Sequence, residues 1–325
     1  MSRSLAVPAV LLALALTGQR AHAAGSGGTW KSASASFTST SAWSTNAAPT
    51  ALTSGTIDNG GTATLGNNVK GVALNLTIGE NKTGALSISN ATASLADSTS
   101  VLGDASSSSG TATITSGSWG NTTSLTVGNS GTGKLTMSGG TVNVGSGTGV
   151  LTLGANAGST GTLNFSGGTL EVASVNGGAG TGIVNFTNSA NLTFAPQLTG
   201  SLAVTFNNSK TTTLTGSSNY TGSTTITKSA IVTVTGGQLH NDANSTLIVG
   251  AANNDSATLN ITNNGYVSGS NVVIGNTASA NGFVVIGSGT PSSSTFNVTG
   301  TILVGTGSQS GTSTTGSGSI TIYAG

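Results

Sequence analysis

The stretch LTVG at residues 125–128 decides the fold, because it recurs as LTLG at residues 151–154, 26 positions later. The longer stretch KLTMSGGTV at residues 134–142 recurs in the same way as TLNFSGGTL at residues 162–170, 28 positions later. In each copy apolar and polar residues alternate with a period of two, which predicts a strand that buries one face. A repeat of roughly 20–30 residues, made of two or three short strands and turns, predicts one coil of a β-helix.

Further copies extend the repeat toward the end of the chain. LIVG at residues 247–250 returns as VVIG at residues 272–275, 25 positions later, and ILVG at residues 302–305 is a third copy. Short alternating runs separated by Gly, Asn and Ser also occur at residues 74–79, 86–88, 135–137, 163–165, 259–261 and 296–298. No 3.6-residue periodicity occurs after residue 23, so the chain is expected to be all-β.

The expected architecture is a right-handed parallel β-helix, a β-solenoid of short repeated coils. One coil alone would expose its apolar edge and backbone groups, whereas stacked coils pair each strand with the next and close a narrow core. At about 4.8 Å per coil, roughly a dozen coils would make a rod on the order of 60 Å long. Glycine suits the tight corners, and stacked Asn, Ser and Thr side chains can form hydrogen-bonded ladders. An antiparallel sandwich of short strands and glycine turns is the alternative fold.

The composition excludes several classes of protein. Serine (49), threonine (56) and glycine (51) make up 48% of the 325 residues, and there is no cysteine. The chain therefore has no disulfide, no thiolate-ligated zinc and no thiol nucleophile. Only 5% of the residues are charged, against about a quarter in an ordinary globular chain, so there is no basic footprint for nucleic acid. A disordered polymer is disfavoured, because the mean hydropathy is +0.16 and Val, Ile and Leu recur regularly.

The first 23 residues have the pattern of a cleaved signal peptide. Arg3 supplies a positive charge, residues 5–16 are apolar apart from Pro8, and Ala21-His22-Ala23 fits the small-x-small cleavage pattern. A transmembrane anchor is the alternative, but this apolar run is short for a bilayer, which needs about 20 residues. Cleavage would leave 302 residues with six lysines, seven acidic residues and a net charge of −1. We therefore expect an exported protein, either on the cell surface or secreted.

The most specific string is LTGSSNYTGSTTIT at residues 214–227, followed by IVTV at residues 231–234. It resembles the passenger-associated repeat of autotransporters, which runs roughly Leu-x-Gly-x-Asn-x-Tyr-x-Gly-x-Thr-x-Ile before a glycine turn and another strand. The matching residues are Asn219, Tyr220, Gly222, Thr224 or Thr225, and Ile226.

The residues of this string also have a physical interpretation. Asn219 suits a corner conformation, Tyr220 can cap the core of a coil, and residues 225–227 would begin the next strand. One departure from the family pattern is that the later glycine is replaced around residues 228–230.

Other parts of the chain resemble autotransporter passenger domains and the related autotransporter-associated β-strand repeat proteins. GTW at residues 28–30 and AWS at residues 42–44 resemble their Trp-containing entry segment. The resemblance implies an entry segment and first coils at residues 24–115, and a repeat-rich passenger region at residues 116–325. A translocating barrel needs many strands of roughly ten residues with aromatic girdles, and residues 282–325 are too short and too poor in aromatics for one. Outer-membrane attachment is therefore expected only through a segment absent from this chain.

Three glycine-rich motifs look like ligand sites but lack essential residues. Residues 128–134 (GNSGTGK) fit most of a phosphate-binding loop, but Leu135 replaces the magnesium-binding hydroxyl, and a strand is expected next instead of a helix. Residues 177–182 (GGAGTG) approach a calcium-binding β-helix repeat, but Gly182 stands where the ligand Asp should be. GSGTG at residues 145–149 lacks the helix that follows a nucleophile elbow. We predict no cofactor and no metal.

The acidic residues are dispersed along the chain. They are Asp58, Glu80, Asp97, Asp104, Glu171, Asp242 and Asp255. We interpret Asp97 and Asp104 as parts of solvated turns. His240 and Asp242 are the only His–acid pair after residue 23, and we interpret residues 240–242 as a polar loop between coils. Polysaccharide cleavage would need paired carboxylates a few ångströms apart, so we predict no catalytic residues.

The sequence therefore predicts a noncatalytic, exported surface protein. It would be a β-helical rod like an autotransporter passenger, mediating adhesion through repeated weak contacts of its Ser, Thr and Asn faces. The expected partners are cell-surface or extracellular glycans or proteins. One alternative is an ice-binding β-solenoid, suggested by Thr-x-Thr motifs at residues 62–64, 111–113, 225–227 and 233–235, whose irregular spacing argues against a continuous rank. The other alternative is a β-helix polysaccharide-active enzyme, which would require a carboxylate cluster.

Overall fold

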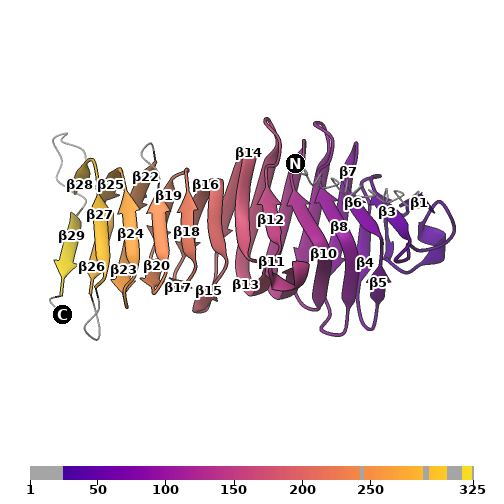
Figure 1. The fold of residues 1–325 in the computed structure, drawn as a ribbon, viewed down its shortest axis with the longest axis horizontal. Coiled ribbons are helices and arrows are strands. Elements are labelled where there is room, and N and C mark those ends of the chain that lie inside the picture. Colours follow the sequence, from indigo (N-terminus) through magenta and orange to yellow (C-terminus); the bar gives the residue numbers. More distant parts are fainter. Residues whose placement is uncertain (1–24, 242–244, 288–292, 306–316, 324–325) are drawn as a thin grey trace, which may run out of the picture.

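The chain forms a parallel β-solenoid of about 11 turns. The computed structural model describes residues 25–241, 245–287, 293–305 and 317–323. The expected signal peptide, residues 1–23, lies outside the described residues. In Figure 1 the strands stand side by side along the long axis, from β1 at one end to β29 at the other. Each complete coil adds a strand segment to each of three faces, which we call A, B and C in chain order.

The strands are assigned to the faces by their pairing, which is parallel throughout the described ranges apart from one antiparallel bridge. Face A consists of β1 (Gly25–Thr29), β3 (Thr53–Ile57), β6 (Asn75–Ile78), the second parts of β8 (Ser94–Leu102) and β10 (Ser118–Val127), β12 (Val150–Leu153), the first parts of β14 (Ser174–Phe186) and β16 (Gln197–Asn208), β18 (Ser217–Tyr220), β21 (Gln238–Asn241), β24 (Tyr266–Gly269) and β27 (Thr295–Val298).

Faces B and C complete each coil. Face B consists of β2 (Ser34–Ser36), β4 (Thr62–Leu65), β7 (Thr83–Ile88), β9 (Ser109–Ile114), the first parts of β11 (Thr132–Val144) and β13 (Thr160–Glu171), the second parts of β14 and β16, β19 (Thr224–Lys228), β22 (Thr246–Val249), β25 (Asn271–Ile274) and β28 (Ile302–Val304). Face C consists of β5 (Lys70–Val72), the first parts of β8 and β10, the second parts of β11 and β13, β15 (Leu192–Phe194), β17 (Thr211–Leu214), β20 (Ile231–Thr235), β23 (Ser256–Thr262), β26 (Asn281–Ile286) and β29 (Ser317–Ile322). Two short 3₁₀ turns, η1 (Thr40–Ala42) and η2 (Gly145–Gly147), lie between strands.

The strand registers confirm the repeats seen in the sequence. Leu125 pairs with Leu151, at the shift of 26, and Leu135 pairs with Leu163, at the shift of 28. The shift of 25 pairs β22 with β25, and β25 in turn pairs with β28. One detail of the sequence interpretation is wrong, because the LTVG and LTLG copies lie on face A whereas LIVG, VVIG and ILVG lie on face B. A glycine corner can follow a strand on either face, so similar strings need not stack on one another.

The core follows the alternation of each strand. In β10, for example, Leu125 and Val127 are fully buried while Thr126 between them faces outward. The buried side chains of all described coils form one continuous cluster inside the solenoid. Burial of each such aliphatic side chain contributes about 1.5–3 kcal/mol. Because each coil buries its side chains against the coils on either side, the stack of coils stabilises the fold and no single coil does so alone.

Glycines occupy corners where a side chain has no room. Gly103 and Gly128 end their face A strands with φ angles of 71° and 75°, in the left-handed region that only glycine enters without strain. A Cβ at Gly103 would lie 2.2 Å from the carbonyl oxygen of Thr132 in the following coil. The corners can therefore stack one strand spacing apart only because they lack side chains.

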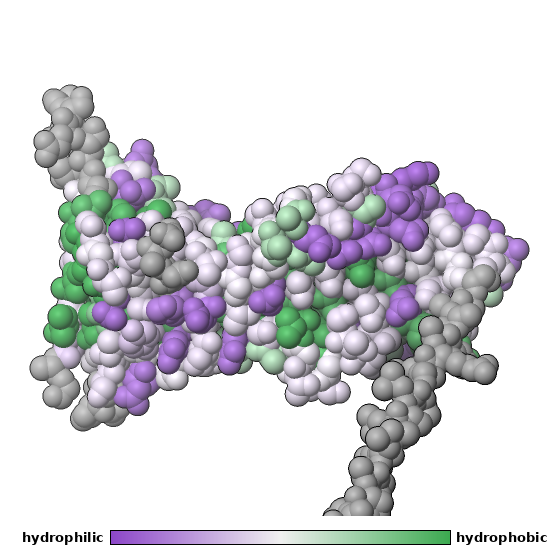
Figure 2. Space-filling model, turned by 45° about the horizontal axis from the view of Figure 1, so that its top comes forward, coloured by the Kyte–Doolittle hydropathy of each residue, from purple (hydrophilic) through white to green (hydrophobic). Residues whose placement is uncertain are grey.

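The two ends of the solenoid differ. At the first coil, Trp43 packs edge-on against Trp30 and Phe37, with ring centroids 5.0 and 5.3 Å away. The Trp43 indole also donates a 2.8 Å hydrogen bond to the Phe37 carbonyl oxygen, so this entry segment caps the core. At the other end the side chains of β28 are 41–48% exposed, and Figure 2 shows apolar residues at this end of the rod.

Face C contains a seam between β13 and β15. The strand β15 pairs with β17 and begins a separate sheet, and no pairing joins it to β13 in the described residues. Four phenylalanines fill the core beside the seam. Phe186 packs edge-on against Phe194 at 5.0 Å and is stacked on Phe206 at 4.7 Å, while Phe165 completes the cluster. Aromatic packing thus replaces the missing backbone ladder.

The passenger-like string lies on consecutive faces. Tyr220 is fully buried at the end of β18, in agreement with a capping role, and residues 225–227 lie in β19 as expected. Asn219 is part of β18 and not of a corner, which corrects the sequence interpretation. At the position of the replaced glycine, Lys228 adopts a φ of 59°, and its backbone N–H donates to the buried Asp255 carboxylate at 2.6 Å. This hydrogen bond stabilises a conformation that lysine rarely adopts.

Candidate functional site

Face A presents an almost continuous column of small polar side chains. Its outward positions are in register from coil to coil and are Thr29, Thr56, Thr77, Val101, Thr126, Thr152, Asn176, Thr199, Asn219, His240, Ser268 and Asn297. Hydrogen bonds join some neighbours, such as the one of 3.1 Å from the Thr199 hydroxyl to the Asn176 carboxamide oxygen. Apart from Val101 and His240, the column therefore repeats a hydroxyl or amide at each strand spacing, about 4.8 Å.

Face B carries a second column of the same kind. Its members are Ser36, Thr64, Ser87, Thr113, Thr136, Asn164, Asn185, Thr205 and Thr225. The Thr-x-Thr motifs at residues 62–64 and 111–113 lie on this face, two coils apart, with Ala85 and Ser87 between them. Their irregular spacing in sequence reflects coils of different length. The two motifs share a face, but Ala85 separates Thr62 from Thr111, so they form no continuous Thr-x-Thr rank, in agreement with the prediction from their spacing.

A ladder of carboxylate and carboxamide groups lines the corner between faces A and B. The Asn129 amide donates to Asp104 Oδ1 at 2.7 Å, and the Asn156 amide donates to Asn129 Oδ1 at 3.1 Å. These bonds confirm the expected stacking of Asn side chains along the rod. Asp104 thus belongs to a structural ladder at a corner.

Asp97 differs from the sequence interpretation most clearly. Its side chain lies inside the solenoid with 4% exposure and not in a solvated turn. Asp97 Oδ2 accepts hydrogen bonds of 2.8 Å from the Trp119 indole and the Ser100 hydroxyl. The Asn121 carboxamide, turned with its nitrogen toward Asp97, donates to Oδ1 at 2.6 Å. Burial raises the pKa of Asp97 to about 6, and the hydrogen bonds from Trp119 and Ser100 lower it by less.

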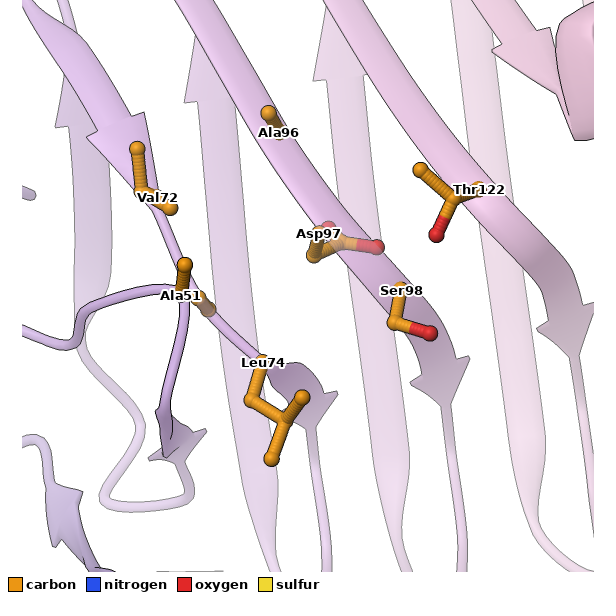
Figure 3. Close-up of a pocket in the computed structure, with 8 residues that line it drawn as sticks. Ala51, Val72, Leu74, Ala96, Asp97, Ser98 and Thr122 are labelled. Atoms are coloured by element: carbon orange, nitrogen blue, oxygen red, sulfur yellow. The ribbon is translucent and has the colours of Figure 1, made fainter.

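A cavity of about 210 Å³ lies beside Asp97 at the corner between faces C and A. Figure 3 shows the Asp97 side chain directed toward the strand that carries Thr122, while Val72 and Leu74 form the opposite wall. The cavity is smaller than the 300–1,000 Å³ typical of ligand pockets. The carboxylate already has three polar neighbours, so the arrangement fits a structural link between β8 and β10. The alternation in the sequence indicates that Asp97 faces inward, since it follows the buried Leu95 by two residues in the same strand.

His240 also lies in an unexpected place. It is part of strand β21, not of a loop between coils, and Asp242 lies outside the described residues. The His240 Nδ1 atom is hydrogen-bonded to the hydroxyl of Ser268, which is 3% exposed. A groove of about 340 Å³ lies on face A between Asn219, Gln238, His240 and Tyr266. Sequence reasoning missed these four residues as a group, because they belong to three different coils.

The glycine-rich motifs are parts of the solenoid. The GNSGTGK motif spans the corner from β10 to β11, so a strand follows it as expected, and the GGAGTG motif lies within β14. GSGTG at residues 145–149 begins with η2 and leads into β12. Within the described ranges, no three His, Asp or Glu side chains gather as a metal site, and no helix there has the length and apolarity to cross a membrane.

Comparison with known proteins gives no relative. No protein-family model, no curated protein and no solved structure matches the chain. Any statement about function therefore has to come from the fold and its surface chemistry.

Proposed function

We propose that the chain is a noncatalytic, exported surface protein that mediates adhesion, in the manner of an autotransporter passenger. In this proposal the solenoid is a stiff rod that holds binding groups at fixed spacing on faces A and B. Residues 1–23 direct its export, and attachment to an outer membrane depends on a segment outside this chain. The partners are glycans or proteins of a cell surface or extracellular matrix.

The observation that carries the proposal is the column of hydroxyl and amide groups on face A, which runs from Thr29 to Asn297. Each group can donate and accept hydrogen bonds, and each contact is weak alone. A rigid array that makes several contacts at once gains affinity through multivalency. Hardly any charge is available, so this attachment would depend little on salt.

The noncatalytic part of the proposal rests on the positions of the acids. Asp97 is buried under Trp119 and Ser100, and Asp104 belongs to the corner ladder. The Asp255 carboxylate accepts backbone N–H bonds from Lys228 and Ala252. A hydrolytic pair needs two carboxyl groups that face a substrate, whereas these carboxylates bind parts of the chain itself.

Attachment of cells or coated beads tests the proposal. Cells that lack the chain should attach less to an extracellular matrix or to neighbouring cells than cells that display it. A displayed variant with Thr126→Val and Thr152→Val, which removes two face A hydroxyls, should attach less, while the face C control Thr213→Val and Thr233→Val should not. Attachment that is unchanged by deletion of the chain, or abolished by 0.5 M salt, would contradict the adhesive rod with its uncharged contacts.

Ice binding remains a second candidate, and the structure supplies an observation in its favour. The Thr-x-Thr motifs at residues 62–64 and 111–113 share face B, where the column continues through Ser87 and Thr136. A flat, rigid array of hydroxyls could order water into a lattice. Thermal hysteresis of the purified chain decides between the candidates: a freezing gap lost in Thr64→Val and Thr113→Val would favour ice binding over adhesion.

A further inference from the structure

We propose that the groove on face A formed by β18, β21 and β24 binds a neutral saccharide. The groove is lined by Asn219, Gln238, His240 and Tyr266 and has a volume of about 340 Å³, within the range of ligand pockets. This inference rests on the proposed adhesive function and assigns it a particular site and ligand class.

The register of the strands brings these side chains together. Asn219 pairs with His240, which pairs with Ser268, so these residues form part of the face A column. Gln238 pairs with Tyr266, and these two residues lie two positions before His240 and Ser268 in their strands. In preceding coils the face A column carries threonines, such as the pair of Thr126 and Thr152. The groove therefore occurs where long polar and aromatic side chains replace short ones.

The lining groups suit the hydroxyls of a sugar. Asn219 and Gln238 are exposed carboxamides, and each offers a donor and an acceptor. A sugar hydroxyl also both donates and accepts, so one carboxamide can bind two neighbouring hydroxyls. The Tyr266 ring adds an apolar surface with a polar edge, against which the C–H face of a pyranose can pack.

Two of the lining side chains are held in place by neighbours. The Tyr266 hydroxyl accepts a 3.2 Å hydrogen bond from the Asn297 carboxamide. The buried Ser268 hydroxyl engages His240 Nδ1, which leaves Nε2 as the ring nitrogen for a ligand. Because the ring positions are fixed before binding, less side-chain entropy is lost when a ligand is bound.

The chemistry of this surface argues against other ligands. Strands β18, β21, β24 and β27 contain no Lys, Arg, Asp or Glu, so neither a phosphate nor a cationic ligand finds an opposite charge within these four strands. A metal ion would find one imidazole and no carboxylate among the lining residues. An extended peptide cannot add to the sheet there, because β21 and β24 are paired on both sides.

The test measures binding of neutral oligosaccharides to the full chain. An array of neutral glucans, mannans, galactans and N-acetylglucosamine oligomers identifies a binder, and titration calorimetry then gives its affinity. Gln238→Ala and Tyr266→Ala should each weaken binding by about tenfold or more, as removal of an anchoring contact does. Tyr266→Phe should lose less, because the ring is kept. Thr213→Ala, on face C and outside the groove, is the matched control and should bind as the parent does.

Several outcomes would overturn the site. These are the absence of binding to any neutral sugar at millimolar concentration, equal affinity in parent and Gln238→Ala, and binding to charged sugars alone. Gln238 is exposed, so Gln238→Ala should fold. Its affinity can therefore still be measured if Tyr266→Ala does not fold. The test also separates the site from the proposed function. Sugar binding without any effect of chain deletion on attachment would refute adhesion, whereas attachment unaffected by Gln238→Ala and without sugar binding would refute only the site.

Discussion

Asp97→Asn should change how the stability of the solenoid depends on pH. The Asp97 pKa is raised from 3.8 to about 6, chiefly by burial. Between these values the folded chain binds a proton that the unfolded chain has released. The protonated carboxyl therefore contributes stability that is fully present below pH 3.8 and is lost as the pH rises through about 6.

The magnitude follows from the size of this shift. From 3.8 to about 6 is a shift of about two units, and each unit corresponds to about 1.4 kcal/mol, which gives an effect of at most about 3 kcal/mol. The Asn121 amide, which donates to Oδ1 in the orientation given above, makes the effect smaller than this limit. An asparagine at position 97 stays neutral and can still accept from Trp119 and Ser100. The variant should therefore gain stability relative to the parent as the pH rises.

Hydrogen exchange of peptides from β8 and β10 is the suitable assay, because stacked coils can open locally. Parent and Asp97→Asn would be compared at pH values from 3.5 to 7.5, after correction for intrinsic exchange, with urea unfolding as a second measurement. Asp104→Asn removes one carboxylate from the corner ladder and serves as the control. Opening free energies of parent and Asp97→Asn that run parallel over this pH range would refute the reasoning, as would a variant that loses stability toward neutral pH.

The other predictions concern stability measured by urea unfolding. Gly103→Ala should lose at least about 1–2 kcal/mol, because the residue has a φ of 71° and its Cβ would lie 2.2 Å from a carbonyl oxygen. Gly120→Ala, with no atom within 4 Å of the added Cβ, is the control, and equal losses in the two would contradict the steric argument. Phe186→Ala should lose about 3–5 kcal/mol, since it opens a cavity in the phenylalanine cluster beside the seam; a loss below about 1 kcal/mol would mean that the seam does not depend on it. Asp255→Ala should lose about 1.5–3 kcal/mol, because the carboxylate accepts the backbone N–H of Lys228 at 2.6 Å. Replacing Lys228 by glycine in that variant should restore part of the loss, and no recovery would argue against strain at this corner.

The fold could be predicted largely from local pattern. Alternation around Leu125 and Leu151, with a glycine after each strand, predicted both the strands and their pairing partners. The same alternation placed Asp97 on the inward face, since it follows Leu95 by two residues, although its acidic side chain suggested a solvated turn. Hydrogen bonds from Ser100 in the same strand and from Trp119 in the next coil make its burial tolerable.

The candidate site could not be predicted in this way, because it depends on the lengths of the coils. Thr199 pairs with a residue 20 positions later, whereas Val267 pairs with one 29 positions later. The lengths of the corners therefore decide which outward side chains become neighbours, and the local alternation does not predict these lengths. The meeting of Asn219, His240 and Tyr266 is therefore a consequence of how three coils stack.

The sequence by itself determined that this chain is a β-solenoid with few charged residues and with small polar residues on its surface, since alternation and glycine corners act between neighbouring residues. Only the tertiary structure decided which of those polar residues form columns, where the buried carboxylate of Asp97 finds its donors, and where the face A groove opens. The physical reason is that strand formation is encoded within a few residues, while the stacking register depends on corners of different length and on the packing of every coil against the next.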